Sequence, residues 1–390
     1  MVTLTVKQKR IGPITGCHPW VFSQALVRIP DGMQPGVPVR LKSENGLFLA
    51  AGYFNSYSQI AVRLWGYDET EEVNENFFAG RIEKAYRQRA RYVARPGTNA
   101  YRVVNGESDL LPGLIVDKYG DYVVVQFHTR GIESWKREIV AALERVIAPA
   151  GIYERSDVAV RKADGLDSAA GLLGGTIPDL ITIEENGFRF LVDVRHGQKT
   201  GFFLDQRDKR QAFMKYTKDT AALNCFSYTG GFSVYALAGG ARAVTSVDSS
   251  EAALRLAKEN VMLNGFDVGK CEFVCGDAKA YLRDCPDTFD AIVLDPLAFI
   301  RDRRKQHEGI AGYKTINERA VKILSRSGIL VTCSCSTHLS LAEFRYLISE
   351  VGGRTKRPLK LLEVYTHGID HPRLVSFTEG DYLKCLFVAG

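Results

Sequence analysis

The feature that most constrains the fold is a series of five short apolar segments between residues 221 and 334. They read AALNCF, AVTSVD, CEFVC, FDAIVLD and GILVTCS, and stretches of helical character separate them. Apolar runs of this length that alternate with helices are typical of parallel strands buried on both faces. From about residue 190 onward, the sequence therefore predicts a doubly wound, mainly parallel sheet.

The part of the chain before this sheet has a different pattern. Residues 1–72 alternate apolar and polar side chains between Gly, Pro and Asn, which predicts short strands in a small β-barrel or sandwich. Residues 73–185 mix helical segments with strands, the last of them GIYERSDVAVRK, and predict an α+β domain. Because 390 residues exceed one ordinary core, we expect a multidomain α/β protein with its third domain at 186–390.

Composition narrows the class of protein. No apolar run approaches the ~20 residues of a membrane span, and the first residues lack the apolar region of a signal peptide. We therefore expect a cytoplasmic protein whose eight cysteines are reduced thiols. No CxxC, HxH or HExxH pattern occurs, so no metal site is expected. The formal charge of +6 suits a polyanionic partner without requiring one.

Candidate ligands follow each strand, because open α/β sheets bind ligands at the carboxyl ends of their strands. A turn with paired glycines follows the first strand and permits close approach of the backbone. Acids follow the next three strands, and two thiols stand at the end of the fifth. In chain order these residues are Phe226 to Gly231, Asp248, Asp277, Asp295, Cys333 and Cys335.

Each of these acids alone is more often a helix N-cap than a ligand. Together, at matched positions, they favour a nucleoside-type cofactor. The loop is neither GxGxxG nor GxxxxGK[ST], which disfavours a dinucleotide and a P-loop. The set suits S-adenosylmethionine, with Asp248 at the ribose and Asp277 at the adenine amine.

Several motifs carry a family resemblance that covers nearly the whole chain. HGQKTGFFLDQRDKR (196–210), LNCFSYTGGFSVYAL (223–237) and SCS (334–336) resemble the bacterial 23S ribosomal RNA large subunit methyltransferase I family. HPWVFSQAL (18–26) is similar to the start of its RNA-binding PUA domain, and DHPRLVSFTEGDYLK (370–384) to its closing hairpin region. The resemblance implies an N-terminal PUA barrel, a central α+β domain, a Rossmann-like methyltransferase domain and the product 5-methylcytidine.

A thiol fits that chemistry. Cytosine C5 is a poor nucleophile, but a thiolate that adds to C6 turns the ring into an enamine. The resemblance assigns Cys335 as this nucleophile and Asp295 as the acid that binds cytosine N3 or its amine. Cys333 is expected to be packed in the core. Leu297 departs from the second proline usual in the family, which puts base selectivity in doubt.

The expected sites comprise two further groups. The cofactor-binding residues are Gln206, Phe226, Ser227, Tyr228, Thr229, Gly230, Asp248, Ser249, Asp277, Ala278 and Asp295. The basic residues expected to contact RNA are Arg155, Arg161, Lys162, Arg301, Arg303 and Arg304. For the last three, which follow the Asp295 loop, a solvated loop is the alternative.

The sequence leaves other functions open. Methylation of a guanine nitrogen needs no thiol, and a non-catalytic RNA-binding assembly factor needs no turnover. The expected partner is 23S rRNA or a large-subunit assembly particle, and no membrane. The oligomeric state stays open, a homodimer included.

Overall fold

The computed structural model describes residues 1–300 and 302–390. These form two compact units, and each unit is assembled from separate stretches of the chain. The first unit consists of Met1–Ile183, Val192–Leu204 and Ile369–Thr378, and the second of Glu184–Leu191, Asp205–Gly368 and Glu379–Gly390. A strand pair, β11 (Ile181–Glu185) and β12 (Phe188–Val192), lies where the chain passes from one unit to the other.

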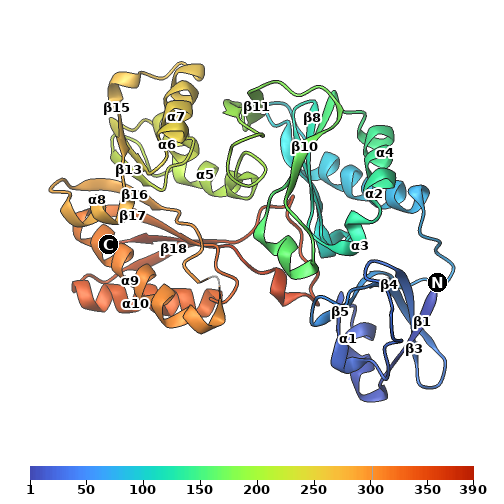
Figure 1. The fold of residues 1–390 in the computed structure, drawn as a ribbon. Helices are drawn as coiled ribbons and strands as arrows, with labels where there is room; N and C mark the ends of the chain where they lie inside the picture. The colour runs from blue at the N-terminus through green and yellow to red at the C-terminus, as the bar shows by residue number, and fades with distance from the viewer. Residues whose placement is uncertain (301) are drawn as a thin grey trace. The chain divides into compact units, whose positions relative to one another are not determined.

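The N-terminal part of the first unit is a five-stranded sheet in the order β1-β3-β4-β5-β2 (Figure 1). β1 pairs with β3 in parallel and the other pairs are antiparallel. Its core is apolar and includes Val6, Leu41, Val62 and Leu64. The strands are β1 (Val2–Val6), β2 (Trp20–Phe22), β3 (Pro38–Ser43), β4 (Phe48–Phe54) and β5 (Ile60–Gly66), with α1 at Ile11–Thr15.

The central part of the first unit is a second five-stranded sheet, in the order β10-β9-β8-β7-β6. Two contacting helices, α2 (Glu75–Tyr92) and α4 (Lys136–Ile147), bury aromatic and aliphatic side chains against it, among them Phe78 and Ile139. The strands are β6 (Ala100–Asn105), β7 (Leu114–Tyr119), β8 (Tyr122–Phe127), β9 (Gly151–Ser156) and β10 (Ala169–Gly175).

One predicted strand in this part is wrong in length. β9 ends at Ser156, whereas the predicted strand GIYERSDVAVRK extended to Lys162. Residues Ala159–Asp164 instead form a 3-10 helix. The buried Arg161 guanidinium donates to the carbonyl of Phe127 and to Glu133, and these contacts hold the segment in its helical turn.

The second unit contains the predicted doubly wound sheet. Its seven strands have the order β15-β14-β13-β16-β17-β19-β18, and the first five in this order are parallel. The five predicted strands are confirmed, and β19 joins β17 antiparallel. The strands are β13 (Ala221–Cys225), β14 (Ala243–Asp248), β15 (Cys271–Cys275), β16 (Phe289–Leu294), β17 (Leu324–Ser334), β18 (Lys360–Tyr365) and β19 (Lys384–Ala389).

Helices cover both faces of this sheet, as parallel strands require (Figure 1). They are α5 (Arg207–Met214), α6 (Gly231–Ala238), α7 (Glu251–Leu263), α8 (Ala278–Asp284), α9 (Gln306–Ile323) and α10 (Leu341–Thr355). The strand order reverses between β13 and β16, which makes the carboxyl ends of these strands the topological switch point. The expected fold class is thereby confirmed.

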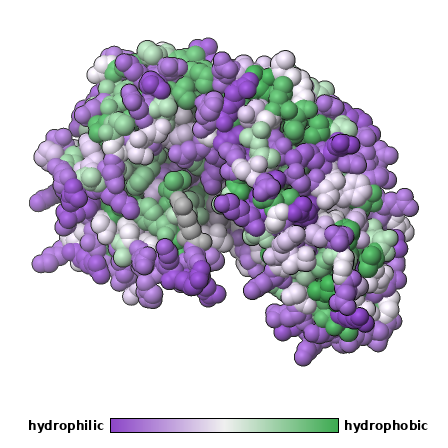
Figure 2. Space-filling model, in the orientation of Figure 1, coloured by the Kyte–Doolittle hydropathy of each residue, from purple (hydrophilic) through white to green (hydrophobic). Residues whose placement is uncertain are grey.

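The outer surface seen in Figure 2 is mostly hydrophilic, with hydrophobic patches of limited extent. None of the described helices combines the length and the apolar character needed to cross a membrane.

Candidate active site

The turn after β13 has an unusual backbone. Phe226, Tyr228 and Gly230 all have positive φ angles, 61°, 49° and 76°. The turn is anchored by the Ser227 amide, which donates to the Val247 carbonyl at 3.0 Å. Gly230 is the N-cap of α6, and a Cβ atom there would lie 2.8 Å from the Cβ of Ala257 on α7. Glycine is therefore required both by conformation and by helix packing.

The same turn carries polar atoms without a protein partner. The Oγ of Ser227 and the Oγ1 of Thr229 are buried and have no hydrogen-bond partner among the described residues. The Oε1 of Gln206 in the second unit is also buried and has no hydrogen-bond partner among the described residues. Buried polar atoms are almost always paired, so these three atoms fit a polar ligand at the turn. A nucleoside cofactor with an amino acid part supplies such groups.

Two acids near this turn already accept backbone hydrogen bonds. Asp248 ends β14, and its carboxylate accepts from the amides of Tyr228 at 2.8 Å and Ser250 at 2.9 Å. Asp277 is exposed and caps α8 through the amide of Lys279. Asp277 thus occupies a helix N-cap position, the expected alternative to a ligand role. The neighbouring Ser249 is exposed and Ala278 is buried.

Asp295 follows β16 directly and lies among other polar and titratable side chains. Its Oδ1 accepts a hydrogen bond of 2.8 Å from the Nε2 of Gln206. Burial, with the neighbouring Asp205 carboxylate as a second cause, raises the pKa of Asp295 to about 7. The amide of Gln206 and the cations of Lys209 and Arg210 oppose this shift. Asp295 is therefore an acid that exchanges its proton near neutral pH.

Cys335 lies one residue beyond the end of β17, the strand adjacent to β16. Its thiol is 3.6 Å from the carbonyl oxygen of Pro296, the residue after Asp295. Ser336 also joins the segment after β17 to the loop after β16. Its Oγ accepts a hydrogen bond from the amide of Ile300 and contacts the Tyr313 hydroxyl at 2.9 Å. The structure thus brings the Cys335 thiol to the loop that begins at Asp295.

Cys333 differs sharply from Cys335. It is 1% exposed within β17, directly opposite Cys385 of β19, which confirms the expected burial. The contact with Cys385 and burial both raise the pKa of its thiol well above the ordinary value. Leu297, the departure from the usual proline, is 47% exposed in the Asp295 loop.

The basic residues expected at RNA divide into buried and exposed members. Arg155 is buried and donates to Asp157 and to the carbonyls of Val194 and Gly197. Arg161 is buried as well, whereas Lys162 is exposed. In the second unit, Arg303 and Arg304 are exposed, and Arg304 pairs with Asp302. Arg301 lies outside the described residues.

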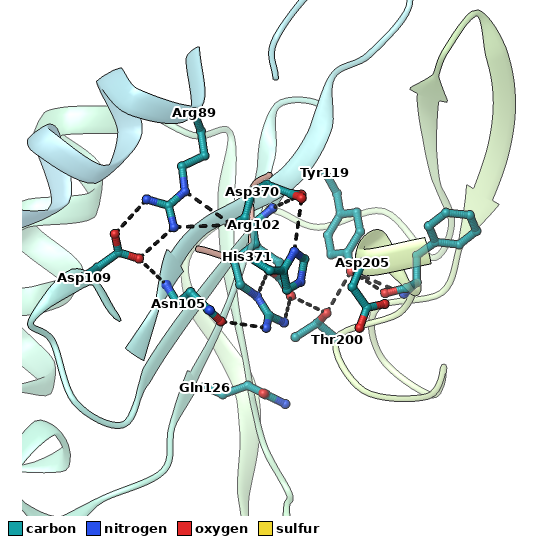
Figure 3. Close-up of polar contacts among 12 residues, drawn as sticks. Arg89, Arg102, Asn105, Asp109, Tyr119, Gln126, Thr200, Asp205, Asp370 and His371 are labelled. Atoms are coloured by element: carbon teal, nitrogen blue, oxygen red, sulfur yellow. Dashed lines mark hydrogen bonds and ion pairs between the residues drawn. The ribbon is translucent and has the colours of Figure 1, made fainter. Parts of the chain in front are cut away.

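Sequence reasoning missed two groups of residues. One is a buried polar network in the first unit, where Arg89 forms a bidentate pair with Asp109 and donates to the carbonyl of Asp370 (Figure 3). The other is Lys384, which is 3% exposed and donates to the carbonyl of Ser336 at 2.6 Å. A lysine at the start of the apolar segment KCLFVA was the only signal in the sequence for this second residue.

Comparison with known proteins places this geometry in a family. The family model described as S-adenosylmethionine-dependent methyltransferase matches residues 124–372, and the PUA-like domain model matches residues 4–66. A curated relative from Cronobacter sakazakii, named ribosomal RNA large subunit methyltransferase I, is 40% identical over 98% of both chains.

Solved structures agree with this match. A protein from Streptococcus mutans described as a SAM-dependent methyltransferase is 26% identical, covers 100% of both chains and superposes with a TM-score of 0.85. SMU.776, described as a methyltransferase and solved with SAH, is 25% identical over 100% of both chains with a TM-score of 0.86. This chain therefore belongs to the ribosomal RNA large subunit methyltransferase I family of S-adenosylmethionine-dependent methyltransferases.

Proposed function

We propose that this protein methylates C5 of a cytidine in 23S ribosomal RNA through a covalent adduct between Cys335 and C6. The observation that carries the proposal is the 3.6 Å contact between the Cys335 thiol and the carbonyl of Pro296. It brings the thiol to the residue that follows Asp295, an acid of raised pKa, at the carboxyl ends of adjacent strands. Methyl transfer to a base nitrogen has no use for a thiol in this position.

The residues divide the chemistry between them. The Cys335 thiolate adds to C6, and the electron pair of the C5–C6 double bond moves into the ring. Asp295 in its neutral form donates a hydrogen bond to N3, which stabilises the negative charge that develops there. S-adenosylmethionine, when bound, would supply the methyl group that C5 attacks and would leave as S-adenosylhomocysteine. Loss of the C5 proton to solvent and cleavage of the Cys335–C6 bond then restore the aromatic ring and the thiolate.

The cofactor is proposed to bind at the turn after β13. Ser227, Thr229 and Gln206 offer the unpaired buried atoms described above. Asp248 has further acceptor capacity for ribose hydroxyls, since each carboxylate oxygen accepts more than one hydrogen bond. Phe226, Tyr228, Gly230, Ser249, Asp277 and Ala278 complete the predicted contact set.

For the RNA, the exposed side chains Lys162, Arg303 and Arg304 are the stronger candidates for phosphate contact. Arg155 and Arg161 are occupied by partners within the protein, so we propose that they support the fold beside such a surface. The target base must be unpaired or extruded before a thiol can reach C6.

The test is transfer of a labelled methyl group from S-adenosylmethionine to unmodified 23S rRNA, given as naked RNA and as large-subunit particles. The RNA is digested and the labelled nucleoside is identified for wild type, Cys335→Ala and Cys333→Ala. We expect 5-methylcytidine from wild type and Cys333→Ala, and a loss of at least about 10³-fold with Cys335→Ala.

Other outcomes would select the alternatives. A labelled guanosine that Cys335→Ala leaves unchanged would favour methylation of a guanine nitrogen. Cofactor binding without label in either RNA substrate would favour a non-catalytic assembly factor.

A further inference from the structure

Lys384 lies at the candidate nucleophile in a setting that is costly for a lysine. It is the first residue of β19, and it stands directly opposite Ser334 in the antiparallel pairing with β17. Its side chain is 3% exposed. Burial of an ammonium group is unfavourable unless it is hydrogen-bonded or paired with an opposite charge.

The direct contacts of Lys384 satisfy two of its three N–H groups but not its charge. The Nζ donates to the carbonyls of Ser336 at 2.6 Å and Tyr382 at 3.0 Å. Both acceptors are neutral backbone groups. The Ser336 carbonyl belongs to the residue after Cys335, so the ammonium holds the turn that presents the thiol.

The titratable groups that face Lys384 include Cys335 itself, which is charged in its thiolate form. Burial lowers the pKa of Lys384 to about 8, while Cys335, Asp381 and Glu343 favour the charged form. Because electrostatic effects are mutual, an ammonium stabilised by the Cys335 thiolate also stabilises that thiolate. An uncharged Cys335 would gain nothing from this neighbour.

Other titratable groups surround this pair. Tyr313 of α9 faces Cys335, and Arg303 faces Glu343 of α10. Asp295 and Lys209 face Cys333, on the strand side of Cys335. Lys384 is the only one of these cations with a described hydrogen bond to the 334–336 turn.

We propose that Lys384 is a positioning residue that fixes the Ser334–Ser336 turn and holds Cys335 as a thiolate. The inference rests on the proposed function only for the use of that thiolate in catalysis. An ordinary cysteine is mostly a thiol at neutral pH. With the Lys384 ammonium in place, Cys335 is a thiolate before the cytosine binds.

The test measures the ionisation of Cys335 directly, without turnover. The full-length protein is alkylated with iodoacetamide between pH 5.5 and 9.5, and peptide mass spectrometry follows the rate at Cys335. The exposed Cys275 is the internal reference. The variants are Lys384→Met, which removes the charge, Lys384→Gln, which keeps an N–H donor without charge, and Lys384→Arg, which keeps the charge.

We expect the midpoint for Cys335 to rise by about one pH unit or more in Lys384→Met and Lys384→Gln, and to stay near wild type in Lys384→Arg. The Cys275 curve should not move. A merely structural role would change the rate at the high-pH plateau and leave the midpoint in place. An unchanged midpoint in a folded Met or Gln variant would overturn the inference.

The two proposals fail in different ways. An unshifted Cys335 midpoint leaves thiol-dependent methylation standing and removes Lys384 from it. Full methylation by Cys335→Ala removes the proposed mechanism, while a shifted midpoint would still establish the lysine–thiolate pair.

Discussion

The acids at the carboxyl ends of two strands of the same sheet, β14 and β16, have different surroundings. At the end of β14, Asp248 receives hydrogen bonds from two backbone amides, those of Tyr228 and Ser250. After β16, Asp295 receives one from the Gln206 amide and lies near a second carboxylate, that of Asp205. Burial, together with the nearby second carboxylate, favours the neutral form of Asp295. Acids at similar sequence positions thus have different surroundings, which fits the proposed roles of Asp248 in cofactor binding and of Asp295 as a proton donor.

The largest expected effect tests the β16 end. Asp295→Asn keeps the size of the side chain but removes the acid proton, so kcat should fall about 10²-fold or more. Single-turnover methylation of 23S rRNA measures this change. Asp284→Asn, at an exposed residue paired with Arg283, is the matched control and should have wild-type turnover. A decrease in kcat of less than about 5-fold for Asp295→Asn would contradict the proposed difference in role between Asp295 and Asp248.

A smaller effect is expected at the β14 end. Asp248→Asn places an NH₂ group where carboxylate oxygens now accept backbone N–H groups and are proposed to accept ribose hydroxyls. The Kd for S-adenosylhomocysteine should rise about 10-fold. Isothermal titration calorimetry measures it. An unchanged Kd would mean that Asp248 serves only to hold the Tyr228 amide.

The pH dependence of stability gives a third comparison. Because the pKa of Asp295 is raised in the folded state, the folded protein binds more protons than the unfolded chain between the ordinary value and about 7. Stability is therefore lost as pH rises through this interval. Relative to wild type, Asp295→Asn should gain at least about 1 kcal/mol between pH 5 and pH 8.

Hydrogen exchange of the β16 amides, corrected for the intrinsic rate at each pH, reports this difference. Asp248→Asn is the control for a strand-end acid that accepts two backbone N–H groups. A gain of equal size in both variants would contradict the assignment of the raised pKa to Asp295.

The smallest effect concerns Asp277. Asp277→Ser retains an N-cap oxygen for α8 and removes the carboxylate, so it separates capping from ligand binding. We expect the Kd for S-adenosylhomocysteine to rise no more than about 3-fold. Asp277→Ala should in addition destabilise the helix by about 1 kcal/mol. A larger loss of affinity in the Ser variant would place Asp277 beside Asp248 as a ligand.

The sequence predicted those parts of the fold that depend on local pattern. Apolar runs between helices identified all five parallel strands, because strands buried on both faces need continuous apolar residues. The Gly230 turn was found from residue type, since a positive φ angle favours glycine. The strand ending at Ser156 was extended too far, because its end depends on contacts that Arg161 makes with distant residues.

The candidate site was predictable in its residue types and less so in its electrostatics. No sequence pattern shows that Arg155 and Arg161 are buried, because arginine is normally exposed and its partners are distant in the chain. The raised pKa of Asp295 depends on burial and, second, on Asp205, and both arise only through folding. Lys384 was missed because a lone lysine at a strand start is ordinary.

The interleaved order of the two units has a consequence for how the chain is made. Arg89 is 1% exposed, and the carbonyl of Asp370 is among its partners. During synthesis from the N-terminus, this partner leaves the ribosome only after more than nine-tenths of the chain. The first unit, although it contains the N-terminus, therefore cannot reach its final state as the earliest independent folding step. Its last buried contacts form only near the end of translation.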